Sequence, residues 1–253
     1  MKLSPRPFRV VVPALLFCGA AIIHTSIAGI VAAPELDAVE RRLDELGPLK
    51  ADLDLWLSMD STERGGVAWS RGRVKVLATT EVDVQEKDGR RWFDFSAPGA
   101  VLKFEPALPL GVYTLSTWML MPPPHHHALI WQGGAGSGSP LFVSDTGLYG
   151  WNELRHAQVT FALLPKGFAG WHHFAVTCDG RTTTAFLDGL RVGSVPEVLA
   201  MNLRSIGNHW QRAHQHWMMC AALDDQLIFR RPLTEPEVRK VMKFGRPPSV
   251  PFR

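Results

Sequence analysis

Residues 171–194 constrain the fold more than any other stretch, because they hold two strand-like runs that each end in an Asp-Gly pair. The runs, 173–178 and 182–187, are rich in Thr, Ala and Phe and have the alternation of strands with one buried face. Asp179-Gly180 and Asp188-Gly189 are hairpin signals, since a type I′ turn needs a positive φ angle at both central residues. The stretch therefore predicts an antiparallel meander, with a third short strand after the second turn.

Short strands of this kind recur at intervals of roughly ten residues along most of the chain. The 19 Pro and 22 Gly residues are spread between them, and 46% hydrophobic residues in a chain of 253 suffice for one large core. Because helices do not alternate with these runs, the pattern indicates a two-sheet sandwich or jelly roll. Besides the meander, the predicted strands are 53–59, 74–78, 81–84, 91–95, 100–104, 113–121, 128–132, 141–144, 148–151, 158–163, 203–207 and 218–229.

Two local features complete the predicted domain. Residues 91–95 and 100–104 flank a Ser-Ala-Pro-Gly sequence and are expected to pair as a hairpin. Residues 233–242 are expected to form a short C-terminal helix, in which Thr234 is the N-cap and Glu237 completes a capping box.

The N-terminal segment has the composition of a targeting element. Lys2, Arg6 and Arg9 precede an apolar run, residues 10–33, that has no charged side chain and is long enough to cross a bilayer. The run also fits a signal peptide with a small-residue cleavage site. Basic residues before it and acidic residues after it direct the remainder outward. We therefore expect residues 1–33 to form a hydrophobic helix that is either a signal peptide or a membrane anchor, and the rest to be exported.

Composition divides the remainder into three parts. Residues 34–49 have apolar residues at helical spacing and predict a short helix or linker, residues 50–245 the jelly-roll domain, and residues 246–253 a tail. A formal net charge of +3 is too small to favour nucleic acid as a partner. Cys178 and Cys220 are compatible with a disulfide outside the cytoplasm, or with two small buried side chains.

Five motifs follow one another between residues 53 and 244. They are Trp92-Phe-Asp-Phe; Tyr113-Thr-Leu-Ser-Thr-Trp118; Trp171-His-His-Phe-Ala-Val-Thr with Phe186-Leu-Asp-Gly189; Ile206-Gly207 with Leu223-Asp-Asp-Gln-Leu-Ile-Phe229; and Pro232-Leu-Thr-Glu-Pro-Glu237. In this order they resemble the motifs of laminin G-like jelly-roll domains among the concanavalin A-like lectins and glucanases. The resemblance implies an all-β, two-sheet antiparallel jelly-roll sandwich. It also implies a mostly non-catalytic module that binds glycans or proteins at rim loops, sometimes with calcium.

An enzymatic alternative depends on the acidic run that contains Glu81, Asp83 and Glu86. It resembles the Glu-x-Asp-x-x-Glu strand of jelly-roll β-glucanases, in which two glutamates act as nucleophile and acid/base. A one-residue bulge at Gln85 would bring Glu86 onto the face of Asp83, and a retaining glycosidase needs its two carboxyl groups about 5–5.5 Å apart. Against catalysis, the run comes early in the domain, where a solvated sheet edge is the simpler interpretation.

Metal binding is a second alternative. His214 and His216 would share one side of a strand, and His209 could join them as a third nitrogen donor. Without a nearby carboxylate or cysteine ligand, this histidine pair is a weak metal signal, and a polar strand edge is the simpler interpretation. Asp188 and Asp224 are interpreted as turn and loop residues, so no cofactor is predicted, although calcium stays possible.

Flat aromatic side chains beside amides are what a sugar-binding surface requires, an apolar face for the ring and polar groups for its hydroxyls. The predicted ligand-binding residues are therefore Trp151, Asn152, His209, Trp210 and Gln211. The leading hypothesis is an exported, non-catalytic module that binds a glycan or protein at the cell surface or envelope, with a membrane contact only through an uncleaved N-terminal segment. The alternatives are a glycoside hydrolase that uses Glu81 and Glu86, and a structural envelope protein.

Overall fold

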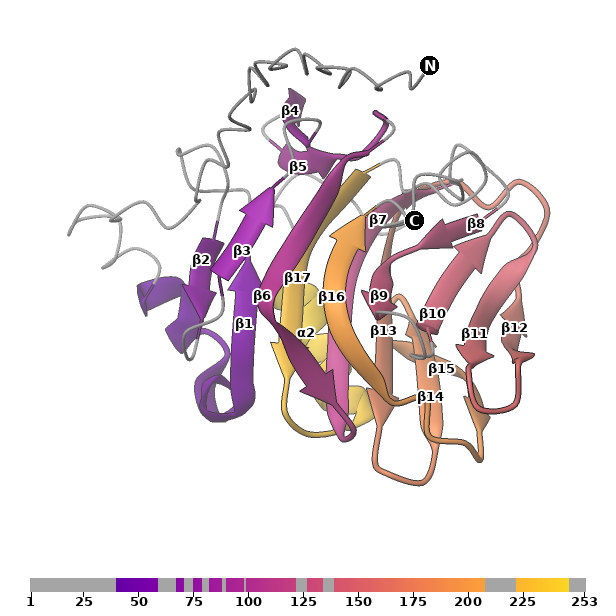
Figure 1. Cartoon of the computed structure of the whole chain (residues 1–253). Helices are drawn as coiled ribbons and strands as arrows, with labels where there is room; N and C mark the ends of the chain where they lie inside the picture. Colours follow the sequence, from indigo (N-terminus) through magenta and orange to yellow (C-terminus); the bar gives the residue numbers. More distant parts are fainter. Residues whose placement is uncertain are drawn as a thin grey trace, which may run out of the picture.

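The predicted all-β sandwich is confirmed by the computed structural model, in which two layers of antiparallel strands pack face to face (Figure 1). The structure describes residues 40–58, 67–70, 75–78, 82–87, 90–97, 99–121, 127–133, 139–207 and 222–245. The predicted hydrophobic helix at 1–33 lies outside these residues. Within them, no helix has both the length and the apolar character that a membrane crossing demands.

The first layer is a nine-stranded sheet, ordered β15-β14-β13-β7-β17-β1-β2, with β5 paired to another part of β17 and β4 paired to β5. Its strands are β1 (Leu53–Leu57), β2 (Val67–Ser70), β4 (Asp83–Lys87), β5 (Arg90–Asp94), β7 (Tyr113–Met121), β13 (Gly170–Cys178), β14 (Thr183–Leu187), β15 (Leu190–Val195) and β17 (Ala222–Phe229). Strand β2 lies at the edge of the sheet and is not among the predicted strands, since it falls between 53–59 and 74–78.

The second layer consists of two four-stranded sheets, ordered β12-β11-β10-β8 and β3-β6-β16-β9. Strands β9 and β10 pack beside each other, so that the two sheets continue one layer (Figure 1). The strands are β3 (Lys75–Ala78), β6 (Val101–Leu110), β8 (His127–Leu129), β9 (Trp131–Gly133), β10 (Ser139–Ser144), β11 (Gly147–Asn152), β12 (Ala157–Leu163) and β16 (Met201–Gly207).

The main core lies between the two layers. Because side chains alternate along each strand, every second residue of the central strands enters it, and those residues are almost fully buried. Representative members are Leu115, Leu148, Val176, Ile206 and Ile228.

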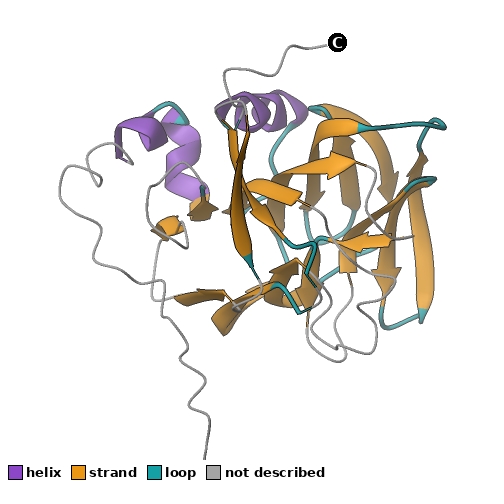
Figure 2. Ribbon diagram, turned by 90° about the horizontal axis from the view of Figure 1, so that it is seen from above, coloured by secondary structure: helices purple, strands orange, loops and turns teal. Residues whose placement is uncertain are grey.

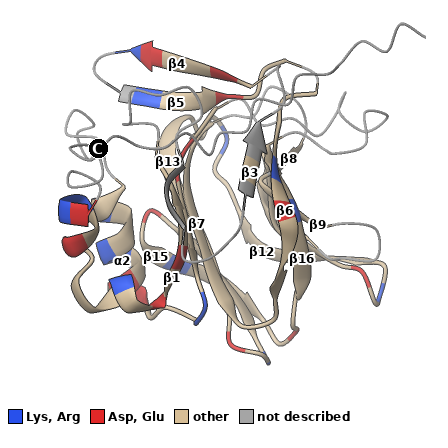
Figure 3. Cartoon of the chain, turned by 60° about the vertical axis from the view of Figure 1, so that its left-hand side comes forward, with Lys and Arg blue, Asp and Glu red and all other residues tan. Residues whose placement is uncertain are grey.

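A second apolar cluster covers the opposite face of the first layer. There the helical residues 40–44, the 3-10 helix η1 (Gly47–Asp52) and helix α2 (Glu235–Phe244) all lie on one side of the strands (Figures 2 and 3). Trp56 of β1 meets Phe244 of α2 edge to face, with ring centroids 5.0 Å apart. This face of the sandwich is therefore closed by the chain itself.

The predicted meander is confirmed, but its two turns differ. Asp188-Gly189 forms the predicted two-residue turn, with φ angles of 49° and 77°. At the first Asp-Gly pair only Gly180 has a positive φ, and the connection is a four-residue loop between Cys178 and Thr183. The predicted type I′ turn is wrong there because the Asp179 carboxylate accepts the backbone N–H groups of Arg181 and Thr182, 2.8 and 2.7 Å away, and holds a wider loop.

The predicted pairing of 91–95 with 100–104 is also wrong. β5 belongs to the first layer, where Phe93 is opposite Leu223 of β17, whereas β6 belongs to the second layer. The chain crosses between layers at Gly99, which has a φ of 95°. The hairpin partner of β5 is β4, and the two strands are joined through another Asp-Gly pair, residues 88–89.

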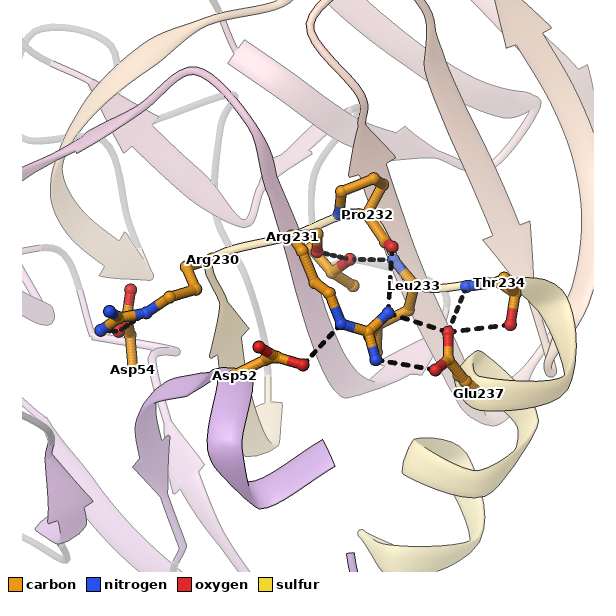
Figure 4. A network of polar contacts seen from close by, with 9 residues as sticks. Asp52, Asp54, Arg230, Arg231, Pro232, Leu233, Thr234 and Glu237 are labelled. Carbon is orange, nitrogen blue, oxygen red and sulfur yellow. Dashed lines mark hydrogen bonds and ion pairs between the residues drawn. The ribbon is translucent and has the colours of Figure 1, made fainter. Parts of the chain in front are cut away.

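One arginine fixes the closing helix to the start of the domain (Figure 4). The Arg231 guanidinium donates to Asp52 at 2.6 Å and, through two nitrogens, to Glu237 at 2.7 and 3.0 Å. Glu237 also accepts the backbone N–H of Thr234 at 2.8 Å, which confirms the predicted capping box. The Arg231 contact lowers the pKa of Glu237 from 4.5 to about 2.

A buried Ser–His pair lies on the helix-covered side of the first layer. Ser116 Oγ is 2.8 Å from Nε2 of His173, and Nδ1 of the same ring has no hydrogen-bond partner among the described residues. Burial lowers the pKa of His173 from 6.5 to about 3, so the ring is neutral in ordinary buffers. Since both side chains are buried, the pair is structural and presents no nucleophile to a substrate.

We expect Glu237→Gln to lower the free energy of unfolding by about 1–2 kcal/mol at pH 7. Because the folded pKa lies below the ordinary value, this contribution is present above pH 4.5 and disappears as the pH falls toward 2. Urea denaturation at pH 7 and pH 3 measures the difference. Glu86→Gln is the matched control, since that side chain is 64% exposed and lies 3.6 Å from Arg91. An equal loss at both pH values would contradict the ion-pair assignment.

We expect the wild-type protein to lose about 2 kcal/mol of stability as the pH falls from 6.5 to 5. In this range His173 is protonated in the unfolded state, whereas the buried ring of the folded state stays neutral. His173→Asn removes the titrating ring and should flatten this part of the pH profile of urea denaturation. His156→Asn changes an exposed histidine with a φ of 47° and should keep the slope. If both variants keep it, His173 is not its source.

Candidate binding surface

The outer face of the β12-β11-β10-β8 sheet carries a row of aromatic side chains. Along β11, Leu148 and Gly150 point into the core, so that Tyr149 and Trp151 point away from it. Both of these rings are partly exposed. We call the surface formed by Tyr149 and Trp151, together with their neighbours on β12, the aromatic row.

Further aromatic rings support the aromatic row from the side of β10. Phe142 is directly opposite Tyr149 across the strand pair, and the two rings stack with centroids 5.5 Å apart and an interplanar angle of 25°. His127 of β8 meets Phe142 edge to face at 5.7 Å. Stacked aromatic pairs of this kind contribute beyond their buried area, which fixes the plane of the Tyr149 ring.

The polar tips of both exposed rings are also held. The Tyr149 hydroxyl lies 3.2 Å from the hydroxyl of Thr146, and Trp151 Nε1 donates to Glu153 at 2.8 Å. Gly147 is necessary here, since a Cβ at that position would be 2.7 Å from the Tyr149 hydroxyl oxygen. The two rings are therefore fixed in orientation by contacts within the protein itself.

Strand β12 places one polar side chain opposite each ring. Thr160 is the register partner of Tyr149, and Gln158 is the register partner of Trp151. Both are exposed, because β12 is the edge strand of its sheet and alternate residues on it face outward. The hydroxyl of Thr160 thus lies beside Tyr149, and the amide of Gln158 lies beside Trp151.

The five predicted ligand-binding residues do not form one site among the described residues. Trp151 belongs to the aromatic row, whereas the adjacent Asn152 faces the opposite side of β11 and is nearly buried. Its amide donates to Glu197 at 2.6 Å, and its oxygen accepts the backbone N–H of Arg155 at 3.1 Å. Asn152 thus connects the β11–β12 turn to the segment after β15. The other predicted ligand-binding residues, His209, Trp210 and Gln211, lie outside the described part of the chain.

The proposed catalytic strand does not have the predicted geometry. The register of β4 against β5 runs without a shift from Asp83 to Lys87, so the predicted bulge at Gln85 is wrong and Glu86 faces away from Asp83. Glu86 lies on an edge strand, exposed and near Arg91. Glu81 is not among the described residues.

The metal candidates His209, His214 and His216 also lie outside the described residues. The described part of the chain contains no group of three or more His, Cys, Asp or Glu side chains that could hold a metal ion. Asp188 accepts the backbone N–H of His173 at 3.0 Å and contacts Nδ1 of His172 at 2.8 Å.

Asp224 and Cys178 are both buried within the protein. The prediction that Asp224 is a loop residue is wrong, because it lies buried in strand β17, where its carboxylate accepts the backbone N–H of Asp225 at 2.9 Å. Cys178 is a free, fully buried thiol in the core, and its alternative disulfide partner Cys220 is not described.

The folded chain is similar to several binding domains of known structure. The binding domain of Paraclostridial Mosquitocidal Protein 1 matches with a TM-score of 0.57 and 14% identity, over 77% of this chain and 52% of that one. The ligand binding domain of botulinum neurotoxin serotype D, in complex with N-acetylneuraminic acid, matches with a TM-score of 0.59 and 10% identity, over 79% of this chain and 52% of that one. This chain thus corresponds to about half of each toxin domain.

A third similar structure is matched by this chain over nearly its whole length. Domain 4 of AbnA, an extracellular arabinanase of Geobacillus stearothermophilus, in complex with arabinotriose, matches with a TM-score of 0.56 and 12% identity. The alignment covers 76% of this chain and 98% of that domain. At such identities these likenesses establish the fold alone.

No curated protein sequence matches this chain closely enough to count as a relative. The family model of the concanavalin A-like lectin/glucanases superfamily matches residues 96–239, which is more than half of the chain. The match includes both strands of the aromatic row and the capping box of α2. The chain therefore belongs to the concanavalin A-like lectin/glucanase superfamily.

Proposed function

We propose that the chain is an exported, non-catalytic module that binds a glycan at the cell surface or envelope through the aromatic row. The observation that carries the proposal is the pair of partly exposed rings, Tyr149 and Trp151, whose orientations are fixed by neighbouring groups. Preorganised rings lose little conformational freedom when a ligand binds, so more of the contact energy appears as affinity.

The chemistry of the aromatic row suits a sugar better than an apolar ligand. The faces of Tyr149 and Trp151 offer apolar surface for the C–H side of a sugar ring, and Gln158 and Thr160 offer hydrogen bonds for its hydroxyl groups. If the ligand at this surface is a protein instead, no glycan of the array described below will bind.

Two similar domains support the proposal, since one was solved with N-acetylneuraminic acid and the other with arabinotriose. Export rests on the sequence of residues 1–33, which also leaves a membrane contact as part of the proposal. A glycoside hydrolase is not favoured, because Glu86 lies at an exposed edge beside an arginine. Calcium dependence is a question for the experiment.

We expect Trp151→Ala and Tyr149→Ala each to weaken glycan binding at least about tenfold, roughly 1.4 kcal/mol, because each removes a ring face. A glycan-array screen of the full chain, with and without calcium, identifies the ligand, and calorimetry measures the change in affinity. Leu154→Ala is the control, since this leucine is 93% exposed on the turn after β11. Binding that survives both aromatic substitutions would exclude the aromatic row as the site.

A further inference from the structure

We propose that the aromatic row binds a segment of an uncharged linear polysaccharide that lies along β11, with consecutive sugar rings over Tyr149 and Trp151. This inference rests on the proposed function and specifies its ligand. Its basis is a repeat in the surface: each ring on β11 has one exposed polar partner directly opposite on β12. Tyr149 with Thr160 is one such unit, and Trp151 with Gln158 is the other.

The two units follow one another along the strand, as the binding of a polymer requires. The backbone positions of residues two apart on one antiparallel strand are separated by roughly 6.8 Å, because the strand rises about 3.4 Å per residue. Both rings point to the same side, and the phenol of Tyr149 is held near Thr146 while the indole of Trp151 is held near Glu153. The two units therefore lie in a line parallel to the strand, as successive sugars of one chain would.

On the side of β12, the row ends at exposed polar side chains. That strand is the last of its sheet, and both Gln158 and Thr160 are exposed. On the other side, the row is backed by Phe142, which is nearly buried under the stacked Tyr149 ring. Because both polar partners are exposed, the two units accept the middle of a chain as readily as its end.

Charge complementarity favours an uncharged chain. The four side chains of the two units are an aromatic phenol, an indole, a hydroxyl and an amide, and none of them carries a charge at neutral pH. The charged groups of the β11–β12 turn are engaged within the protein, since Glu153 accepts from Trp151 and Arg155 pairs with Glu197. A carboxylated or sulfated sugar would find no free cation within the units themselves.

Two linked subsites predict a dependence on chain length. Once the first sugar occupies one ring, the second meets the other ring at a high effective concentration, so affinity rises sharply from one sugar to two or more. Removing either ring should abolish that rise and leave a weak, length-independent interaction. A site that captures a terminal sugar would show neither effect.

The test is isothermal titration of the full chain with cello-, xylo- and arabino-oligosaccharides of one to six units, and with N-acetylneuraminic acid as a charged single sugar. We expect at least one neutral series to gain tenfold or more in affinity between the monomer and the longer members. Trp151→Ala and Tyr149→Ala should each reduce the affinity for the longest member to that for the monomer.

Two further variants keep the test valid if an aromatic substitution impairs folding. Gln158→Ala changes only an exposed polar side chain and should weaken the longer oligosaccharides by several fold, whereas Leu154→Ala should change nothing. If single sugars bind as tightly as the hexamers, the polymer inference fails and glycan binding stands. If neither these sugars nor any glycan of an array binds, the proposed function fails and takes the inference with it.

Discussion

The pairing of β7 with β13 is the constraint on which the rest of the sandwich depends. All nine positions are in register, from Tyr113 opposite Cys178 to Met121 opposite Gly170. Because side chains alternate, this one pairing sends Leu115 and Val176 into the main core and leaves Ala175 for the cluster under α2. A shift by one residue would exchange the two faces and lose both clusters at once.

Much of this arrangement could be predicted from local patterns. The strand at 113–121, the meander and the capped C-terminal helix are specified by alternation, Asp-Gly turns and a Thr234–Glu237 pair, which are all short-range signals. The pairing of β5 with β17 could not be predicted in this way, because no local pattern around Phe93 indicates which distant strand β5 pairs with. The Asp-Gly pair at 88–89 was the available signal for its true hairpin partner.

The candidate site was predictable only in part for the same reason. Trp151 could be identified as an aromatic residue near polar groups, but the contribution of Tyr149, Gln158 and Thr160 depends on the register of β11 against β12. The alternation within each strand was visible in the sequence, whereas the offset between the strands was not. Asn152 was predicted to bind ligand because it is an amide next to a tryptophan in the sequence. In the structure its side chain lies on the other side of the strand and donates a hydrogen bond to Glu197.

The two outer faces of the molecule differ. Helix α2 and residues 40–52 cover the outer face of the first layer (Figure 3). The aromatic row lies on the outer face of the second layer. The layers also touch directly at Gly193 of β15, where an added Cβ would overlap the carbonyl oxygen of Phe161 on β12. An edge strand is normally supported by hydrogen bonds on one flank alone, yet β12 also contacts β15 of the other layer. The position of the β12 edge beside the aromatic row therefore depends on a residue of the opposite sheet that has no side chain.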